Sequence, residues 1–283
     1  MKKLMFILAM AFFMVGMVAC DIIEEPYFKE NNGGGNQPGN NGGGNQPGEE
    51  PTVKKYVLLE DYTGVKCVNC PAAGELALQL QEQYHHQVVV LSVHAGDLAE
   101  FPLFDLTTTE GDEWWKFLAF QQNPTGAINR KMVNGGYAYD TPMWADAVAE
   151  VLQEEAALEM TPSIQYNETT RELKVDIKSK FIAELPDTYS LTVCIMEDSL
   201  VGIQQTPEGI VKDYVHRHVF RGTMNGTWGE NINTTAIAPN DEIVKSYTTT
   251  LNEAYNADQC YIIAYVANSD TKEVLQVTEK KIK

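Results

Sequence analysis

The chain has 283 residues, of which 44% are hydrophobic and 21% are charged, and its formal net charge is −18 at pH 7. That length is sufficient for one or two hydrophobic cores. The negative charge argues against binding to nucleic acid and against peripheral binding to an anionic bilayer, because both surfaces repel an acidic protein. The composition is that of a soluble, exported acidic protein.

An export signal is predicted at residues 1–19. Two lysines follow the first residue, and residues 4–18 are apolar but too few to span a membrane, as in a secretory signal peptide. The segment ends in Met17-Val18-Ala19-Cys20, which resembles the lipobox of bacterial lipoproteins. That resemblance implies cleavage after Ala19 and acylation of Cys20, which would hold the protein stably at a membrane. Ordinary cleavage, with Cys20 incidental, is the alternative.

Residues 20–52 are predicted to form a flexible linker behind the lipid anchor. The nonapeptide Asn-Asn-Gly-Gly-Gly-Asn-Gln-Pro-Gly occurs twice in succession between residues 31 and 48. It has no apolar residue, so burial cannot offset the entropy lost on ordering it. A Gly-rich coil of about 30 residues spans on the order of 30 Å, which would hold the folded part away from the membrane.

Residues 53–160 are predicted to form an α/β domain. The expected elements are strands at 56–61, 88–93, 126–132 and 137–139, and helices at 71–84, at 112–121 and from Thr141 as N-cap with Pro142 at the first position. The run at 88–93 is continuously apolar, as in a buried parallel strand. Trp114, Phe117 and Leu118 are expected to face inward from the second helix. This order of elements is that of the thioredoxin fold.

Residues 161–283 are predicted to form an all-β sandwich of the immunoglobulin-like type. Apolar residues alternate with polar ones in short segments separated by turn signals; the inward-facing sets are 173, 175, 177 and 181, then 191, 193 and 195, then 260, 262, 264 and 266. Cys194 and Cys260 lie on two of these strands, either as an inter-sheet disulfide or as buried thiols. His216 and His218 share a strand face at period two, where an ordinary sheet surface is favoured over a metal or anion site.

The residues most suited to chemistry are Cys67 and Cys70, which lie between the first strand and the first helix. A helix N-terminus stabilises a thiolate, and two intervening residues let the second sulfur resolve a mixed disulfide. The ammonium group of Lys66 would lower the pKa of Cys67 further. Half of a zinc site is disfavoured, because no second Cys pair or paired His lies at suitable spacing. Copper binding by His94 with the two cysteines is also disfavoured, so no metal site and no cofactor are expected.

Two further features resemble thioredoxins. Asp61 lies six residues before Cys67, where thioredoxins carry a buried aspartate that relays protons; a desolvated carboxyl there would have a raised pKa, as a proton acceptor needs. Pro124, between Asn123 and Thr125, matches the cis-proline loop that faces the disulfide and presents backbone groups to an extended substrate.

The sequence departs from thioredoxins beside the cysteines. Lys66 occupies a position where thioredoxins have a tryptophan, which removes an aromatic platform for substrate. The dipeptide Val68-Asn69 stands where reducing thioredoxins have Gly-Pro, so the direction of any redox reaction stays open.

Taken together, the segment from Tyr62 to Pro71, the Asn-Pro-Thr-Gly loop at 123–126, the lipobox and the β domain are similar to the Omp28-related outer-membrane lipoproteins, a thioredoxin-like group of Gram-negative bacteria. The similarity covers nearly all of the mature chain. It implies an outer membrane lipoprotein that faces the periplasm or the cell surface.

These features predict a membrane-tethered thiol–disulfide oxidoreductase-like lipoprotein of the bacterial cell envelope. Cys67 would attack a substrate disulfide, Cys70 would resolve it, and Asp61 would move the proton. The loop at 123–125 would align the substrate. The expected partners are exported protein thiols or disulfides, and the membrane through the lipid on Cys20. The alternative is a surface-exposed binding or adhesion lipoprotein whose thioredoxin scaffold keeps a structural or vestigial disulfide.

Overall fold

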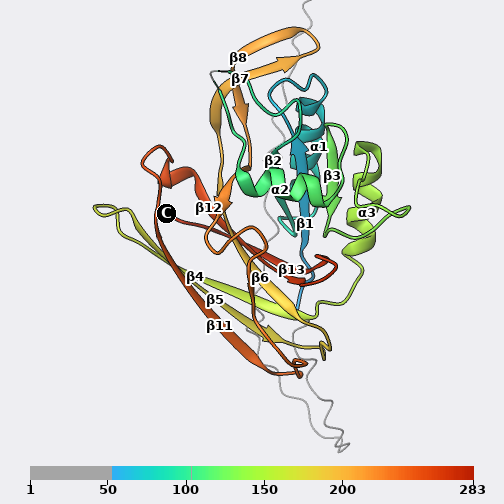
Figure 1. Cartoon of the computed structure of the whole chain (residues 1–283), viewed down its shortest axis with the longest axis vertical. Helices are drawn as coiled ribbons and strands as arrows, with labels where there is room; N and C mark the ends of the chain where they lie inside the picture. The colour runs from blue at the N-terminus through green and yellow to red at the C-terminus, as the bar shows by residue number, and fades with distance from the viewer. Residues whose placement is uncertain (1–52, 103) are drawn as a thin grey trace, which may run out of the picture. The chain divides into compact units, whose positions relative to one another are not determined.

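The computed structural model describes residues 53–102 and 104–283 (Figure 1). These residues belong to one compact unit. The predicted signal peptide at 1–19, Cys20 with its predicted acylation, and the whole of the linker predicted at 20–52 lie outside the described residues. Within the described part of the chain, no helix has the length and apolar character that crossing a membrane requires.

The first part of the described chain alternates strands and helices. In chain order the elements are β1 (Val57–Thr63), α1 (Cys70–Gln83), β2 (Val88–His94), α2 (Thr109–Phe117), β3 (Thr125–Ile128), the 3-10 helix η1 (Thr141–Met143) and α3 (Trp144–Val151). β1 pairs with β2 in parallel and with β3 in the antiparallel direction. Every residue of these three strands is buried. For β2 this confirms the prediction made from the continuous apolar run at 88–93.

The second helix begins earlier than its predicted start at residue 112. The side chain of Thr108 caps it, because its Oγ1 accepts a hydrogen bond from the backbone N–H of Gly111 at 3.0 Å. Trp114 and Leu118 are buried as predicted. The prediction that Phe117 faces inward is wrong, since 39% of that residue is exposed.

Three predictions around β3 and α3 are also wrong. β3 ends at Ile128 because Asn129 and Arg130 take positive φ angles of 47° and 50°, which no strand continues through. The segment at 137–139 contributes a single bridge to Gly126 and no strand. Thr141 does not cap α3; it begins η1, and α3 starts at Trp144 without a side-chain cap.

The rest of the chain is almost entirely β structure. Its strands are β4 (Leu158–Tyr166), β5 (Glu172–Phe181), β6 (Tyr189–Glu197), β7 (Leu200–Thr206), β8 (Gly209–His216), β9 (Val219–Thr223), β10 (Glu230–Asn231), β11 (Glu242–Thr250), β12 (Cys260–Asn268) and β13 (Val274–Lys281), with a 3-10 helix η2 (Ala257–Gln259) before β12. On β5 the apolar residues that alternate in the sequence are buried, as predicted. β11, β5 and β4 form a three-stranded sheet, and β7 and β8 form a hairpin of their own.

One large sheet joins the early and late parts of the chain. Its strand order is β13-β12-β6-β9-β2-β1-β3, and β10 adds to β6. The link is β9, which pairs antiparallel with β6 and parallel with β2 at Ser92. The boundary expected between residues 160 and 161 falls inside β4. The described chain is therefore a mixed α/β fold with several sheets and few helices.

Cys194 and Cys260 are both buried free thiols. They lie on adjacent strands of the large sheet, where Cys194 is opposite Ile263 and Cys260 is opposite Glu197. Cys194 packs in the core that contains Trp114, whereas Cys260 packs in the separate core formed with β5. The two sulfurs thus face opposite sides of one sheet. Of the two alternatives predicted for this pair, the buried thiols are therefore correct and the inter-sheet disulfide is not.

Gly126 on β3 allows α3 to pack closely. A Cβ at this position would lie 2.5 Å from Nε1 of Trp144, the atom that donates a hydrogen bond to the carbonyl of Tyr139. We expect Gly126→Ala to lower the free energy of unfolding by about 1–3 kcal/mol, because a filled core can only shift to admit a methyl group. Urea denaturation measures this change.

Gly136→Ala is the matched control, because no atom lies within 4 Å of the added Cβ. Its effect should stay within about 0.5 kcal/mol. Equal unfolding midpoints for the two variants would contradict the packing argument.

Candidate functional site

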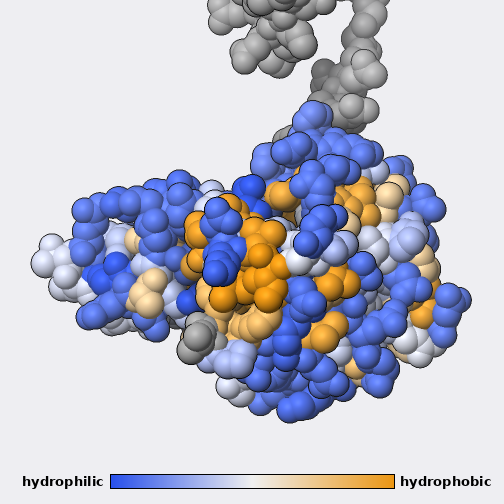
Figure 2. All heavy atoms as spheres, turned by 90° about the horizontal axis from the view of Figure 1, so that it is seen from above, coloured by the Kyte–Doolittle hydropathy of each residue, from blue (hydrophilic) through white to orange (hydrophobic). Residues whose placement is uncertain are grey.

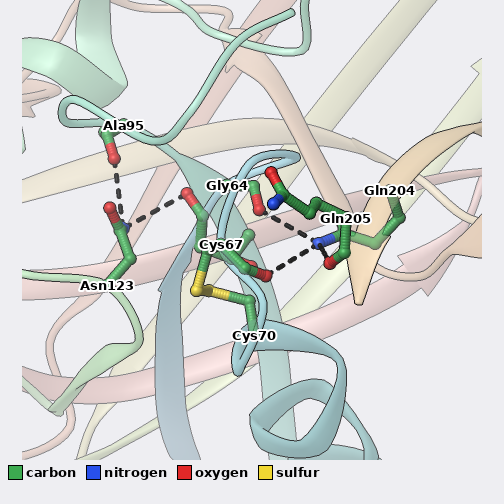
Figure 3. Close-up of a disulfide and its surroundings, with 8 residues drawn as sticks. Gly64, Cys67, Cys70, Ala95, Asn123, Gln204 and Gln205 are labelled. Atoms are coloured by element: carbon green, nitrogen blue, oxygen red, sulfur yellow. Dashed lines mark hydrogen bonds between the residues drawn. A yellow bond between two sulfur atoms is a disulfide. The ribbon is translucent and has the colours of Figure 1, made fainter. Parts of the chain in front are cut away.

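The candidate site is built around a disulfide between Cys67 and Cys70 (Figure 3). Cys67 lies in the turn after β1, and Cys70 is the first residue of α1. The turn is closed by a backbone hydrogen bond from Cys67 N to Gly64 O at 3.0 Å. Cys67 and Cys70 are only 2% and 3% exposed. The predicted position at a strand–helix junction is correct, but the sulfurs are more enclosed than free access to a substrate would require.

The loop after β2 holds this turn from one side. Val65 N and Lys66 N donate to the carbonyls of Ala99 and Leu98 at 3.3 and 3.0 Å. The contact is so close that a Cβ on Gly64 would lie 2.3 Å from the Leu98 carbonyl oxygen. Glycine is therefore required at this position for steric reasons. Lys66, which directly precedes Cys67 in this turn, is half-buried.

Asp61 lies on β1 with its side chain buried beneath the disulfide region. It is 2% exposed, and its Oδ1 has no hydrogen-bond partner among the described residues. Burial raises the pKa of this carboxyl from 3.8 to about 7. Asp61 and Cys70 line the same small cavity. A carboxyl that changes its protonation state near neutral pH is thus placed beside the second cysteine.

The Asn123–Pro124 peptide bond is cis. Asn123 Nδ2 donates to the carbonyl oxygens of Thr63 and Ala95 at 3.3 and 3.2 Å, which fastens this loop to the ends of β1 and β2 (Figure 3). Thr125 follows as a buried residue at the start of β3. Pro124 and Asn69 line one shallow groove of about 390 Å³. The loop and the Cys-x-x-Cys turn are therefore neighbours.

The β7–β8 hairpin also contacts the turn, and the sequence analysis did not place it there. Gln204 of β7 is buried, and its Nε2 donates to the carbonyls of Gly64 and Cys67 at 3.3 and 3.0 Å (Figure 3). Gln205 N donates to Val65 O at 2.8 Å. The turn residues Pro207 to Gly209 indicate a hairpin in the sequence, but no local signal indicates what the hairpin packs against.

The end of this hairpin also brings histidines to the cavity. β8 ends at His216, and His218 has a positive φ of 53°, so the two do not share a strand face. Both are buried and line the cavity with His94, whose ring centroid is 5.5 Å from that of His216. The ordinary sheet surface predicted for His216 and His218 is therefore wrong.

These imidazoles are neutral at pH 7. Burial lowers the pKa of His94 to about 3 and those of His216 and His218 to about 4, because a charged ring loses its hydration. Within residues 53–102 and 104–283, no group of three or more His, Cys, Asp or Glu side chains has a geometry that could hold a metal ion.

Several solved structures are similar to this chain. HBP35 of Porphyromonas gingivalis superposes with a TM-score of 0.63 at 16% identity, covering 82% of this chain and 77% of that one. A protein of Agrobacterium tumefaciens gives a TM-score of 0.49 at 16% identity, covering 82% and 96%. A domain of the outer membrane lipoprotein Omp28 from P. gingivalis gives 0.33 at 23% identity, covering 45% and 89%. No curated protein matches the chain.

A match to a family model shows which protein family the chain belongs to. The model described as outer membrane protein Omp28 matches residues 114–283, from within α2 to the last residue. This match covers more than half of the sequence. The chain therefore belongs to the Omp28 family of outer membrane proteins, which places it at the outer membrane.

Proposed function

We propose that this protein is a membrane-tethered thiol–disulfide oxidoreductase-like lipoprotein, with a thioredoxin-like part followed by a β-sandwich. One observation carries the proposal: Asp61, the Cys67–Cys70 pair and the cis bond before Pro124 surround one strand–helix junction. The parallel β1 and β2, with α1 between them and an antiparallel β3 after the cis bond, support the thioredoxin-like part. The family match begins after the cysteines, so the redox assignment rests on this geometry alone.

In the reducing direction, the Cys67 thiolate attacks a substrate disulfide and releases one substrate thiolate, which takes a proton from solvent. Asp61 then removes the proton of the Cys70 thiol. The Cys70 thiolate attacks Cys67, a disulfide forms between them, and the second substrate thiolate leaves. Two thiols of the protein are oxidised and one substrate disulfide is reduced to two thiols. The reverse sequence oxidises a substrate.

The proposal includes the anchor and the partners. Acylation of Cys20 would tether the protein, and the substrates would be exported protein thiols or disulfides. The cis loop at 123–125 would align an extended substrate in the groove that Pro124 lines.

The test is catalysis of thiol–disulfide exchange by the full chain, measured as reduction of insulin with dithiothreitol as the electron donor. Cys67→Ser should abolish the catalysed rate, because the attacking sulfur is lost. Cys70→Ser should retain substrate as a mixed disulfide, because nothing resolves it. Cys260→Ala is the matched control and should leave the rate unchanged, since that thiol is buried in the other core. An inactive wild-type chain, or an active Cys67→Ser variant, would refute the enzyme proposal.

A second candidate is a binding or adhesion lipoprotein with a static disulfide, and two observations favour it. Both cysteines are almost fully buried. The β7–β8 hairpin carries exposed apolar residues, among them Val201 at 62% and Ile210 at 56%. Figure 2 looks onto this end of the molecule and shows hydrophobic residues gathered near the centre of the face. A reduction potential below about −300 mV would favour this candidate, because structural disulfides lie in that range.

A further inference from the structure

A second groove lies beside the loop that carries the cis bond. It has a volume of about 680 Å³ and is lined by residues 97–98, 115–116 and 119–123. We call it the Trp115 groove, because the side chain of that residue is the largest in its lining. Gln122 lines both this groove and the shallow groove of Pro124. The two grooves therefore meet at the cis loop.

Both walls of the Trp115 groove are hydrogen-bonded to the segment that precedes Cys67. On one wall, the Leu98 carbonyl accepts a hydrogen bond from Lys66 N at 3.0 Å. On the other wall, Asn123 Nδ2 donates to Thr63 O at 3.3 Å, and Asn123 directly precedes the cis bond (Figure 3). The Leu98 backbone thus lies one hydrogen bond and one peptide unit from Cys67. About three residues of an extended substrate span such a distance.

The indole ring of Trp115 is held in a fixed position. Its six-membered ring packs on Gly96, where an added Cβ would lie 2.6 Å from Cζ2 of the indole. Its ring centroid is 6.1 Å from that of Tyr62 and 5.7 Å from that of Phe120, and both of these residues are buried. Trp115 itself is half-buried, whereas its neighbour Trp114 is fully buried. The groove therefore contains an aromatic surface that needs little further ordering to bind a ligand.

The rest of the lining favours an uncharged apolar ligand. Leu98 is 38% exposed and lines the groove together with Trp115. The two charged residues, Asp97 and Lys116, are exposed and have opposite signs, so the lining carries no net charge. The amide of Gln122 can both donate to and accept from a peptide backbone. Apolar contacts with a polar rim are typical of sites that bind polypeptides.

We propose that the Trp115 groove binds a large apolar side chain of the substrate polypeptide, close to the substrate's cysteine, and that Trp115 and Leu98 determine this specificity. The inference rests on the proposed function. The occupant is an extended segment of an exported protein that continues from the groove of Pro124 across the cis loop. Its binding buries apolar surface on both molecules and holds the substrate sulfur beside the disulfide. A disulfide too small to reach the groove gains nothing from it.

The experiment measures the second-order rate constant with which three disulfides oxidise the reduced full chain. Two are mixed disulfides of glutathione with a neutral cysteine peptide, whose residues three positions to either side of the cysteine are phenylalanine in one and serine in the other. The third is oxidised glutathione, which is too short to reach the groove. Wild type should react about tenfold faster with the phenylalanine peptide than with the serine peptide, because an apolar pocket discriminates by about this factor.

Two variants assign this preference to the groove. Trp115→Ala and Leu98→Ser should each lose most of it, while the rate with oxidised glutathione stays within about twofold of wild type. That rate shows that the turn around the disulfide is intact. Leu98→Ser also keeps the carbonyl that binds Lys66 N, so it removes the apolar contact alone. Met132→Ser is the matched control, because Met132 is 62% exposed and lines a different groove, along α3. It should behave as wild type.

The outcomes separate the groove from the proposed function. Equal wild-type rates with the two peptides would overturn the groove and leave the proposed function standing. The same holds for a preference that survives in both Trp115→Ala and Leu98→Ser, or that is lost to the same extent in Met132→Ser. A wild-type chain that exchanges none of the three disulfides would overturn the proposed function and the groove with it.

Discussion

Arg130→Met is expected to lower the free energy of unfolding by about 3–5 kcal/mol, because it leaves the buried carboxylate of Glu60 without its partner. Arg130 Nε and Nη2 donate to the two oxygens of Glu60 at 2.8 and 2.6 Å, and both side chains are almost fully buried. Nη2 also donates to the hydroxyl of Tyr265 at 3.1 Å. The pair joins β1, the segment after β3, and β12.

Chemical denaturation of the full chain measures this effect. The double variant Glu60→Leu with Arg130→Met should recover most of the lost stability, because no charge then remains buried. Lys178→Met is the matched control: it breaks an exposed ion pair with Glu242 at 2.8 Å and should cost less than about 1 kcal/mol. A cost for Arg130→Met as small as that control would contradict the argument.

Asp61→Asn should stabilise the protein at alkaline pH and have little effect near pH 4. Burial raises the pKa of Asp61 from 3.8 to about 7. Between those values the folded chain keeps a proton that the unfolded chain has released, so stability falls as pH rises through this window. Above about pH 7 the buried, ionised carboxylate of Asp61 lowers the free energy of unfolding by roughly 4 kcal/mol. The neutral amide of Asn, which has the same size, avoids this loss. The same variant should slow closing of the disulfide, because the proton acceptor is lost.

Urea denaturation of wild type and variant at about pH 4 and about pH 8 tests this sign. The buried histidines contribute in the opposite sense, because their lowered pKa values make stability fall as pH falls below about 6.5. That contribution is common to wild type and variant and cancels in their difference. Asp97→Asn, at an exposed position, should change stability by less than about 0.5 kcal/mol at both pH values. A destabilised Asp61→Asn at alkaline pH would contradict the burial argument.

The redox candidates could be predicted because their arrangement is local. Cys67 and Cys70 share one turn with Asp61 only six residues away, so a strand followed by a helix is sufficient to bring them close. Pro124 could be anticipated from its resemblance to a known loop. The alternating pattern on β5 likewise predicted which side chains are buried, because strand periodicity is a property of the backbone.

Contacts between distant segments could not be predicted in this way. Gln204 bonds to Cys67 across 137 positions, and His216 reaches His94 from a hairpin whose local pattern resembles any exposed β ribbon. Glu60 and Arg130 are 70 positions apart, and a charged pair in the sequence does not reveal that both members are buried. The opposite orientation of Cys194 and Cys260 depends on strand register, and one residue of slip would reverse it.

For this protein, the sequence alone determined the order of the elements around the disulfide, the identity of the candidate redox residues and the inward faces of the main strands, because these follow from backbone periodicity and short spacing. Only the tertiary structure decided that a late hairpin contacts the turn that holds Cys67 and that three histidines line the same cavity as Asp61. Strand pairing between remote segments depends on the summed packing of the whole core, and no short window of sequence contains that sum.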